Sequence, residues 1–127
     1  MNFNPVTFTE VGSKLSSKTI SIFTTGGFLF SSGLVHHESL SAYSHCILSY
    51  DADARAIFFE FTSDKNALGA ITITHRKENN GTATSRSFFQ YFKLTPKDLA
   101  GRYEAKNIKL NRGEQRLMIS LKERLTK

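Results

Sequence analysis

The sequence predicts one α+β domain built mainly from antiparallel strands. Short runs of alternating apolar and polar residues recur along the chain, and Gly, Asn and Asp residues typical of tight turns separate them. The 127 residues are enough to bury a hydrophobic core, and no repeat, low-complexity tract or linker divides them. We therefore expect residues 1–127 to form a single domain, with roughly six or seven strands in an open sheet and roughly one or two short helices.

The first predicted elements are a strand pair and a short helix. Residues 19–23 alternate apolar and hydroxyl side chains, Gly26 and Gly27 interrupt the pattern, and residues 28–30 are apolar. This pattern indicates a strand, a tight turn and a second strand. From residue 33 to residue 43 the apolar side chains recur at helical spacing, so we expect about one or two helical turns there.

The clearest hairpin joins residues 45–50 to residues 55–62 through the short polar connection 51–54. In its second strand, alternation separates a core face from a face that is only partly exposed to water. The core face carries Ile57, Phe59 and Phe61, and the other face carries Phe58, Glu60 and Thr62.

A further strand and a second helix follow this hairpin. Residues 70–74 alternate, with their two isoleucines expected to point inward, and residues 79–81 supply the next turn. We expect Thr84 or Ser85 to cap a short helix that runs through Phe92, because phenylalanines recur there at three and four residues.

The last predicted elements are two basic strands. We expect Pro96 to end the preceding helix. Residues 101–110 and 115–121 then form a strand pair with a turn at residues 111–113. A helix is the alternative for the last stretch, because leucines recur there every four residues among good helix formers. The alternation of apolar and polar residues favours the strand.

The net positive charge lies entirely in the last third of the chain. Residues 93–127 hold ten Lys or Arg and four Asp or Glu, whereas residues 1–92 hold seven of each sign, so the net charge of +6 is a local property. A segregated basic segment on a neutral body is typical of a surface that binds a polyanion, most often nucleic acid. Solubility alone is the alternative explanation.

The leading hypothesis is a non-enzymatic nucleic-acid-binding protein that uses this segment. Alternation gathers basic side chains on one face of each predicted strand, which makes a track for phosphates. The expected contacts are Arg102, Lys106, Lys109, Arg112, Arg116 and Lys122, with Tyr103 or Tyr50 as stacking partners for bases.

A homo-oligomeric protein-interaction module without nucleic-acid binding is the second hypothesis. Phe58 and Met118 motivate it, because each lies on a strand face that is otherwise polar. On this hypothesis the basic segment keeps the protein soluble and steers its association with an acidic partner.

No arrangement of titratable residues indicates catalysis or a metal site. The closest cluster in sequence belongs to different expected elements, and neighbours on one strand point to opposite faces. This cluster consists of His36, His37, His45 and Cys46. Common catalytic and phosphate-binding motifs are absent from the sequence, so we expect no enzyme activity, no cofactor and no small-molecule substrate.

The single cysteine and the N-terminus bear on the compartment. One cysteine allows no internal disulfide, which fits a reducing environment. The N-terminus lacks the features of a signal peptide, and no apolar run is long enough to span a bilayer. We expect a soluble, cytoplasmic protein that does not bind membranes.

The order of these features resembles a small group of bacterial proteins of unassigned function. Their fold is similar to that of the single-stranded-DNA-binding transcriptional regulators, which include the eukaryotic transcriptional coactivator and the plant Whirly proteins. The resemblance rests on the run Phe28 to Gly33, the short helix after it, the strand pair around 49–51 and 57–59, the Phe88–Phe89 helix, and Gly101-Arg102-Tyr103-Glu104 before the last strand.

This resemblance implies a strongly bent antiparallel sheet, a homodimer and binding of unpaired DNA, with RNA as the alternative ligand. The Lys-Gly-Lys-Ala-Ala-Leu motif of the Whirly proteins is absent, so no binding residue carries over by position. The coactivators also pair their subunits through a helix after the last strand. Here only the short charged end 122–127 follows the predicted last strand.

Overall fold

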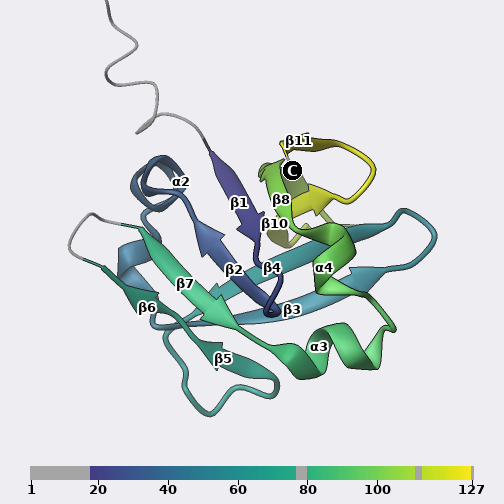
Figure 1. The fold of residues 1–127 in the computed structure, drawn as a ribbon. Helices are drawn as coiled ribbons and strands as arrows, with labels where there is room; N and C mark the ends of the chain where they lie inside the picture. The colour runs from purple at the N-terminus through teal and green to yellow at the C-terminus, as the bar shows by residue number, and fades with distance from the viewer. Residues whose placement is uncertain (1–17, 77–79, 111–112, 127) are drawn as a thin grey trace, which may run out of the picture.

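The strands form two antiparallel sheets, whereas the sequence predicts one open sheet (Figure 1). This computed structural model describes residues 18–76, 80–110 and 113–126. The six-stranded sheet, called sheet A, has the order β11(Arg124–Thr126), β8(Gly101–Glu104), β1(Thr19–Ile22), β2(Gly27–Phe30), β7(Gly81–Thr84), β6(Thr74–His75). The five-stranded sheet, called sheet B, has the order β5(Ala70–Thr72), β3(His45–Asp51), β4(Ala56–Thr62), β10(Gln115–Ser120), β9(Lys106–Lys109).

Two buried residues mark the places where the chain passes from one sheet to the other. Ile73 separates β5 from β6 and is 5% exposed, and Ala105 separates β8 from β9 and is 2% exposed. The Ile73 amide donates to the Ser44 carbonyl, and the Ala105 amide donates to the Lys18 carbonyl, each at 2.8 Å. Because β1 pairs with both β2 and β8, and β3 with both β4 and β5, these two crossings close the strands into a ring.

The two crossings explain why one sheet was expected. The predicted strands 70–74 and 101–110 are extended, and buried and exposed side chains alternate along each of them as far as the crossing residue, Ile73 or Ala105. A period of two does not show where a strand changes its hydrogen-bonding partner. The strand pairing therefore corrects the expected single sheet to two sheets. Alternation alone does not determine which strands pair.

The predicted hairpins are confirmed. Strand β1 pairs with β2 in a register that places Ile20 opposite Phe30, and β3 pairs with β4 from residue 45 to residue 51. Residues 115–120 are the strand β10 and not the alternative helix, because they pair with β4 on one side and β9 on the other. The turn expected at 79–81 and the one at 111–113 fall partly outside the described residues, and β7 was not predicted.

Short helices flank the sheets. Helix α2(Ser32–His37) begins at the N-cap Ser31 and is followed by the 3₁₀ turn η2(Leu40–Ala42), as expected for residues 33–43. Helix α3(Arg86–Tyr91) confirms the second predicted helix, and its N-cap Ser85 accepts a hydrogen bond from the Phe88 amide at 3.3 Å. In Figure 1, α2 lies on one side of the molecule, and α3 and α4(Pro96–Leu99) lie on the other.

The expectation for Pro96 was wrong. Proline opens α4 at its first turn and does not end α3, because a missing N–H costs nothing at a position that lacks an intrahelical acceptor. Helix α3 ends earlier through a Schellman motif, in which the amides of Lys93 and Leu94 donate to the carbonyls of Gln90 and Phe89.

The core lies between the two sheets and is rich in phenylalanine. Phe28 and Phe30 of sheet A meet Phe59 of sheet B with ring centroids 5.2 and 5.7 Å apart, in edge-to-face geometry. Ile57 and Phe59 are fully buried, as predicted for the core face of β4, while Phe61 is half-buried at its end. Aromatic pairs of this kind add about 0.5–1.5 kcal/mol beyond the burial of their surface.

Within the described part of the chain, none of the helices has both the length and the apolar character required to cross a membrane.

Cys46 on β3 provides a test of this core. The thiol is fully buried, and burial raises the pKa of Cys46 from 9.0 to about 12. The unfolded chain releases this proton near pH 9 and the folded chain near pH 12. The stability that the neutral thiol provides is therefore complete below pH 9 and is lost as the pH rises from 9 to about 12.

We expect the free energy of unfolding of the wild type, relative to Cys46→Ala, to fall by about 2 kcal/mol between pH 8 and about pH 10.5. Urea unfolding at both pH values measures this difference, and the alanine variant removes the contributions of other titrating groups. A pH-independent difference between the two proteins would show that the thiol is accessible to water.

Candidate nucleic-acid interface

The basic strands have the predicted alternation. Along β8 and β9 the side chains of Arg102, Glu104 and Lys106 are exposed, whereas Tyr103 and Ala105 between them are buried. The same holds on β10, where the outward-facing Arg116, Met118 and Ser120 are half-buried and Leu117 and Ile119 point into the core. Alternation therefore assigns the faces of β8 and β10 correctly, whereas on the edge strand β9 the neighbours Lys106 and Asn107 are both exposed.

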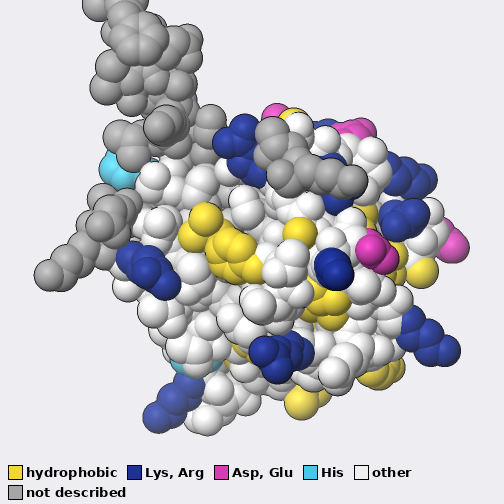
Figure 2. Space-filling model, in the orientation of Figure 1, with side chains coloured by type: hydrophobic (Ala, Val, Ile, Leu, Met, Phe, Trp, Pro, Cys, Tyr) yellow, Lys and Arg dark blue, Asp and Glu magenta, His cyan; other side chains and the backbone are white. Residues whose placement is uncertain are grey.

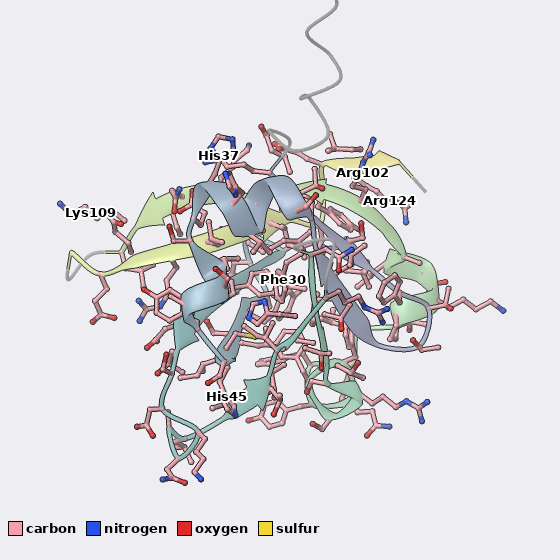
Figure 3. All side chains as sticks on the ribbon, turned by 90° about the vertical axis from the view of Figure 1, so that its left-hand side faces the viewer. Phe30, His37, His45, Arg102, Lys109 and Arg124 are labelled. Carbon is pink, nitrogen blue, oxygen red and sulfur yellow. The ribbon has the colours of Figure 1, made fainter. Side chains whose placement is uncertain are left out.

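The expected contacts do not converge on one track. Because the chain changes sheets at Ala105, Arg102 belongs to sheet A and Lys109 to sheet B. Figure 3 shows these two side chains well apart, with Lys109 at the left edge of the view and Arg102 at the top. On the face drawn in Figure 2, the Lys and Arg side chains form separate groups with uncharged surface between them.

Two of the expected contacts are held by carboxylates. Lys106 Nζ lies 3.1 Å from Glu123 Oε2, and the hydrogen bond and charge of Glu123 raise the pKa of Lys106. Arg116 Nη2 lies 2.9 Å from Glu60 Oε1 and also pairs with Glu114. A phosphate at either site has to compete with the existing ion pair, so both are weaker candidates than the sequence suggested.

Three of the expected contacts remain available. Arg102, Lys109 and Lys122 are exposed, and within the described ranges no carboxylate lies at ion-pair distance from any of them. Arg102 lies on β8, and Lys122 lies in the turn that leads to the neighbouring strand β11. Arg112 lies outside the described residues.

The two expected stacking partners take other positions. Tyr103 is 1% exposed, and its hydroxyl donates to the Leu99 carbonyl at 2.6 Å. Burial raises the pKa of Tyr103, and the charge of nearby Arg124 opposes this shift. Tyr103 is thus a core residue, a correction that follows from its inward position on β8. Tyr50 is half-buried, with its ring 5.3 Å from that of Phe92.

Sequence analysis missed a second surface, on α3. Tyr91 there is 78% exposed, and Arg86 and Lys93 near the two ends of the helix are also exposed. A signal was present in the sequence, because residues 79–97 contain no Asp or Glu and place this tyrosine between the two cations. The sequence interpretation of that stretch is mainly a helix that packs its phenylalanines, and it considers Tyr91 and Arg86 only as additions to the basic strands and not as parts of one separate surface.

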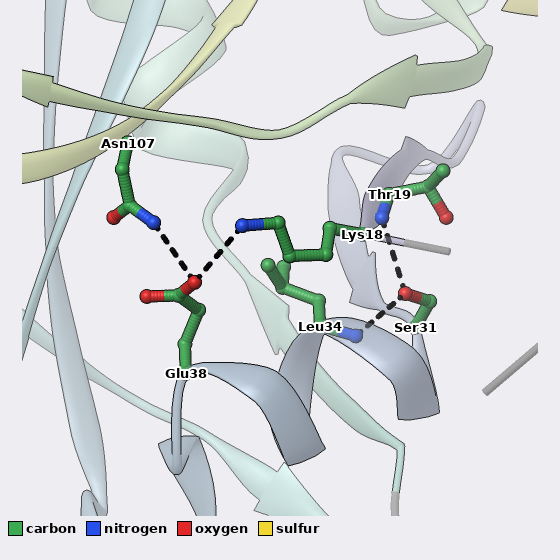
Figure 4. Close-up of polar contacts among 6 residues, drawn as sticks. All are labelled: Lys18, Thr19, Ser31, Leu34, Glu38 and Asn107. Atoms are coloured by element: carbon green, nitrogen blue, oxygen red, sulfur yellow. Dashed lines mark hydrogen bonds and ion pairs between the residues drawn. The ribbon is translucent and has the colours of Figure 1, made fainter. Parts of the chain in front are cut away.

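A polar network holds α2 against both sheets (Figure 4). The Glu38 carboxylate accepts hydrogen bonds from Lys18 Nζ at 3.2 Å and from Asn107 Nδ2 on β9 at 2.8 Å. Ser31 Oγ accepts from the amides of Thr19 and Leu34, both at 3.1 Å. An open groove of about 330 Å³ lies beside this network, between η2 and the ends of β4, β9 and β10.

The histidines and the cysteine are dispersed. Figure 3 shows His37 and His45 at opposite ends of the molecule. His75 Nε2 lies 2.8 Å from the Tyr43 carbonyl oxygen, in a hollow that His36 and Arg76 also line and to which the described part of the chain contributes no carboxylate. Among residues 18–76, 80–110 and 113–126, no three His, Cys, Asp or Glu side chains come close enough to hold a metal ion.

Comparison with known proteins adds no assignment. No protein-family model, curated protein or solved structure gives a significant match to this chain. The similarity to the single-stranded-DNA-binding regulators therefore stays a prediction, and the function has to be argued from the surface itself.

The position of Tyr103 gives a direct test. We expect Tyr103→Phe to lower the free energy of unfolding by about 1–2 kcal/mol, because the Leu99 carbonyl loses a buried donor. Tyr91→Phe is the matched control, since its exposed hydroxyl should contribute little. Urea unfolding of both variants measures the difference, and equal stabilities would contradict the buried hydrogen bond.

Proposed function

We propose that this protein binds nucleic acid without catalysing a reaction, mainly through contacts to phosphates. The observation that carries the proposal is the net charge of +6 located in residues 93–127, together with exposed cations there that have no carboxylate partner among the described residues. Arg102, Lys109 and Lys122 are these cations. Single-stranded DNA is the ligand that the resemblance favours.

The dispersion of these cations determines the kind of binding. Widely spaced charges without a stacking platform contact the backbone and do not read base sequence. Each phosphate contact releases counterions, so three contacts predict a slope of about −2 in a plot of log affinity against log salt for single strands. Binding should accordingly be weak at physiological salt and strong at low salt.

The charge-reversed variant Arg102→Glu/Lys122→Glu tests this proposal. We expect it to lose about two phosphate contacts, which should reduce the salt slope by about 1.4 and weaken binding to all sequences. Fluorescence anisotropy of labelled oligonucleotides at several salt concentrations measures both quantities. Lys65→Glu/Arg76→Glu is the control, because it makes the same change in net charge at exposed residues outside the segment.

A smaller loss in the control is the expected outcome. Equal losses in the two double variants would assign the binding to net charge alone. A wild type that binds neither single strands nor duplex at low salt would exclude the proposal.

The outer face of sheet B supports a second candidate function, self-association. Phe58 on β4 lies directly opposite Met118 on β10, and both are half-buried although they point away from the core. Glu60 and Arg116, which form an ion pair, border this apolar pair on the same face. A surface that carries both charges beside an apolar centre is self-complementary, as a two-fold dimer requires.

We expect Met118→Lys to convert a homodimer into a monomer. Burial of an unpaired ammonium at the centre of a two-fold contact opposes association twice, once in each copy. Analytical ultracentrifugation measures the mass, and thermal unfolding shows whether the variant is folded. Ser41→Lys, on the exposed 3₁₀ turn, should leave the mass unchanged. A monomeric wild type at tens of micromolar would exclude this second candidate.

A further inference from the structure

Helix α3 forms a ridge between two hollows on the surface. A hollow of about 450 Å³ lies on the side of Tyr91, and one of about 410 Å³ lies on the side of Arg86. The first is lined by Leu48, Gly69, Ala70, Ile71, Ser85, Ser87, Phe88, Tyr91 and Phe92. Among the residues that the structure describes, no acidic side chain lines either hollow.

The Tyr91 ring is exposed yet firmly supported. It is 78% exposed and packs edge-to-face on Phe92, with ring centroids 4.8 Å apart. Phe92 in turn packs on Phe88 at 5.2 Å and on Tyr50 at 5.3 Å. A ring held in this way loses little conformational freedom when a flat ligand stacks on it, and the apolar side chains of the hollow provide further contact.

The charges around the ridge favour an anionic ligand. Arg86 and Lys93 are exposed and have no ion-pair partner among the described residues, and residues 79–97 contain no Asp or Glu. Arg86 is the first residue of α3 and Lys93 lies two residues beyond its last, so the two cations stand at the two ends of the ridge. An exposed aromatic ring flanked by cations is the combination with which proteins bind single-stranded nucleic acid.

The backbone at Lys93 carries strain. Its φ is +57°, in the left-handed region, and it takes the position in the Schellman motif that glycine usually fills. A lysine is less stable than glycine in this conformation, because its Cβ lies too close to the backbone. The strain keeps a cation at the end of the ridge, where glycine would give a more stable turn without charge.

We propose that the α3 ridge binds single-stranded nucleic acid, with one base stacked on Tyr91 over the adjoining hollow and phosphates held by Arg86 and Lys93. This inference rests on the proposed function and adds to it the stacking site that the basic strands lack. Ser85 and Ser87 at the edge of the hollow offer hydroxyls to the polar edge of the base.

Tyr91→Ala is the first test, with Tyr91→Phe as the matched control. Loss of one stacked base should weaken single-strand binding about 5- to 150-fold. Binding to duplex should not change, because paired bases do not reach the ring, and the salt slope should stay the same. Tyr91→Phe keeps the ring and should bind like the wild type. Anisotropy with a labelled oligothymidylate and a labelled duplex measures all three proteins.

Lys93→Gly is the second test, because it separates binding from stability. Glycine relieves the left-handed strain, so we expect the thermal midpoint to stay the same or rise. The salt slope for single strands should fall by about 0.7, since one phosphate contact is lost. Weaker binding by a protein that is at least as stable as the wild type cannot result from unfolding.

Some results would exclude the α3 ridge as the binding site and leave the proposed function intact, and one result would exclude both. If the wild type binds oligonucleotides and Tyr91→Ala binds equally well, the ridge is not the stacking site although the protein binds nucleic acid. An equal loss for single strands and duplex would likewise exclude base stacking. If Tyr91→Ala changes only the sedimenting mass, the ridge is a contact between copies. If the wild type binds no oligonucleotide at low salt, both proposals are wrong.

Discussion

Closure of the two sheets around a shared aromatic core is the constraint on which the rest of the structure depends. The chain crosses between the sheets at Ile73 and Ala105, and both residues are buried where it bends. At the second crossing the Ala105 amide donates to the Lys18 carbonyl, and the Glu38 carboxylate joins α2 to Lys18 and to Asn107 on β9. Closure also leaves few unpaired strand edges, so the outer faces and helices are the surfaces left for binding.

The same closure decides what the basic segment can do. In one continuous hairpin the cations of residues 101–122 would share the same two paired strands, but the chain changes sheets at Ala105, so Arg102 belongs to sheet A and Lys109 to sheet B. Neighbouring carboxylates then neutralise Lys106 and Arg116. The local excess of positive charge remains, and it is the term on which the proposed salt-sensitive attraction of a polyanion rests.

The α3 ridge carries an exposed aromatic ring together with exposed cations, whereas on the basic strands the cations are exposed but Tyr103 is buried. The phenylalanines of α3 anchor this helix in the core, and its exposed flanks present Tyr91 on one side and Arg86 on the other, with the exposed Lys93 just beyond its last residue. Just after the last turn of this helix, Lys93 has left-handed backbone, which is less stable for lysine than for glycine but keeps a charged side chain at this position. Because α3 packs on the hydrophobic core, its exposed side chains are held more firmly for ligand binding than side chains on a mobile loop would be.

The sequence by itself determined the local structure and the total charge. Alternation located most strands and the inward faces of β4, β8 and β10, and the serine before α3 marked where that helix begins, because periodicity and capping act over a few residues. Only the tertiary structure decided the partners. The sheet changes at Ile73 and Ala105, the burial of Tyr103, the ion pairs of Arg116 and the exposure of Tyr91 all depend on segments far apart in the chain. Local patterns do not encode such pairings, because register and closure follow from long-range hydrogen bonding and core packing.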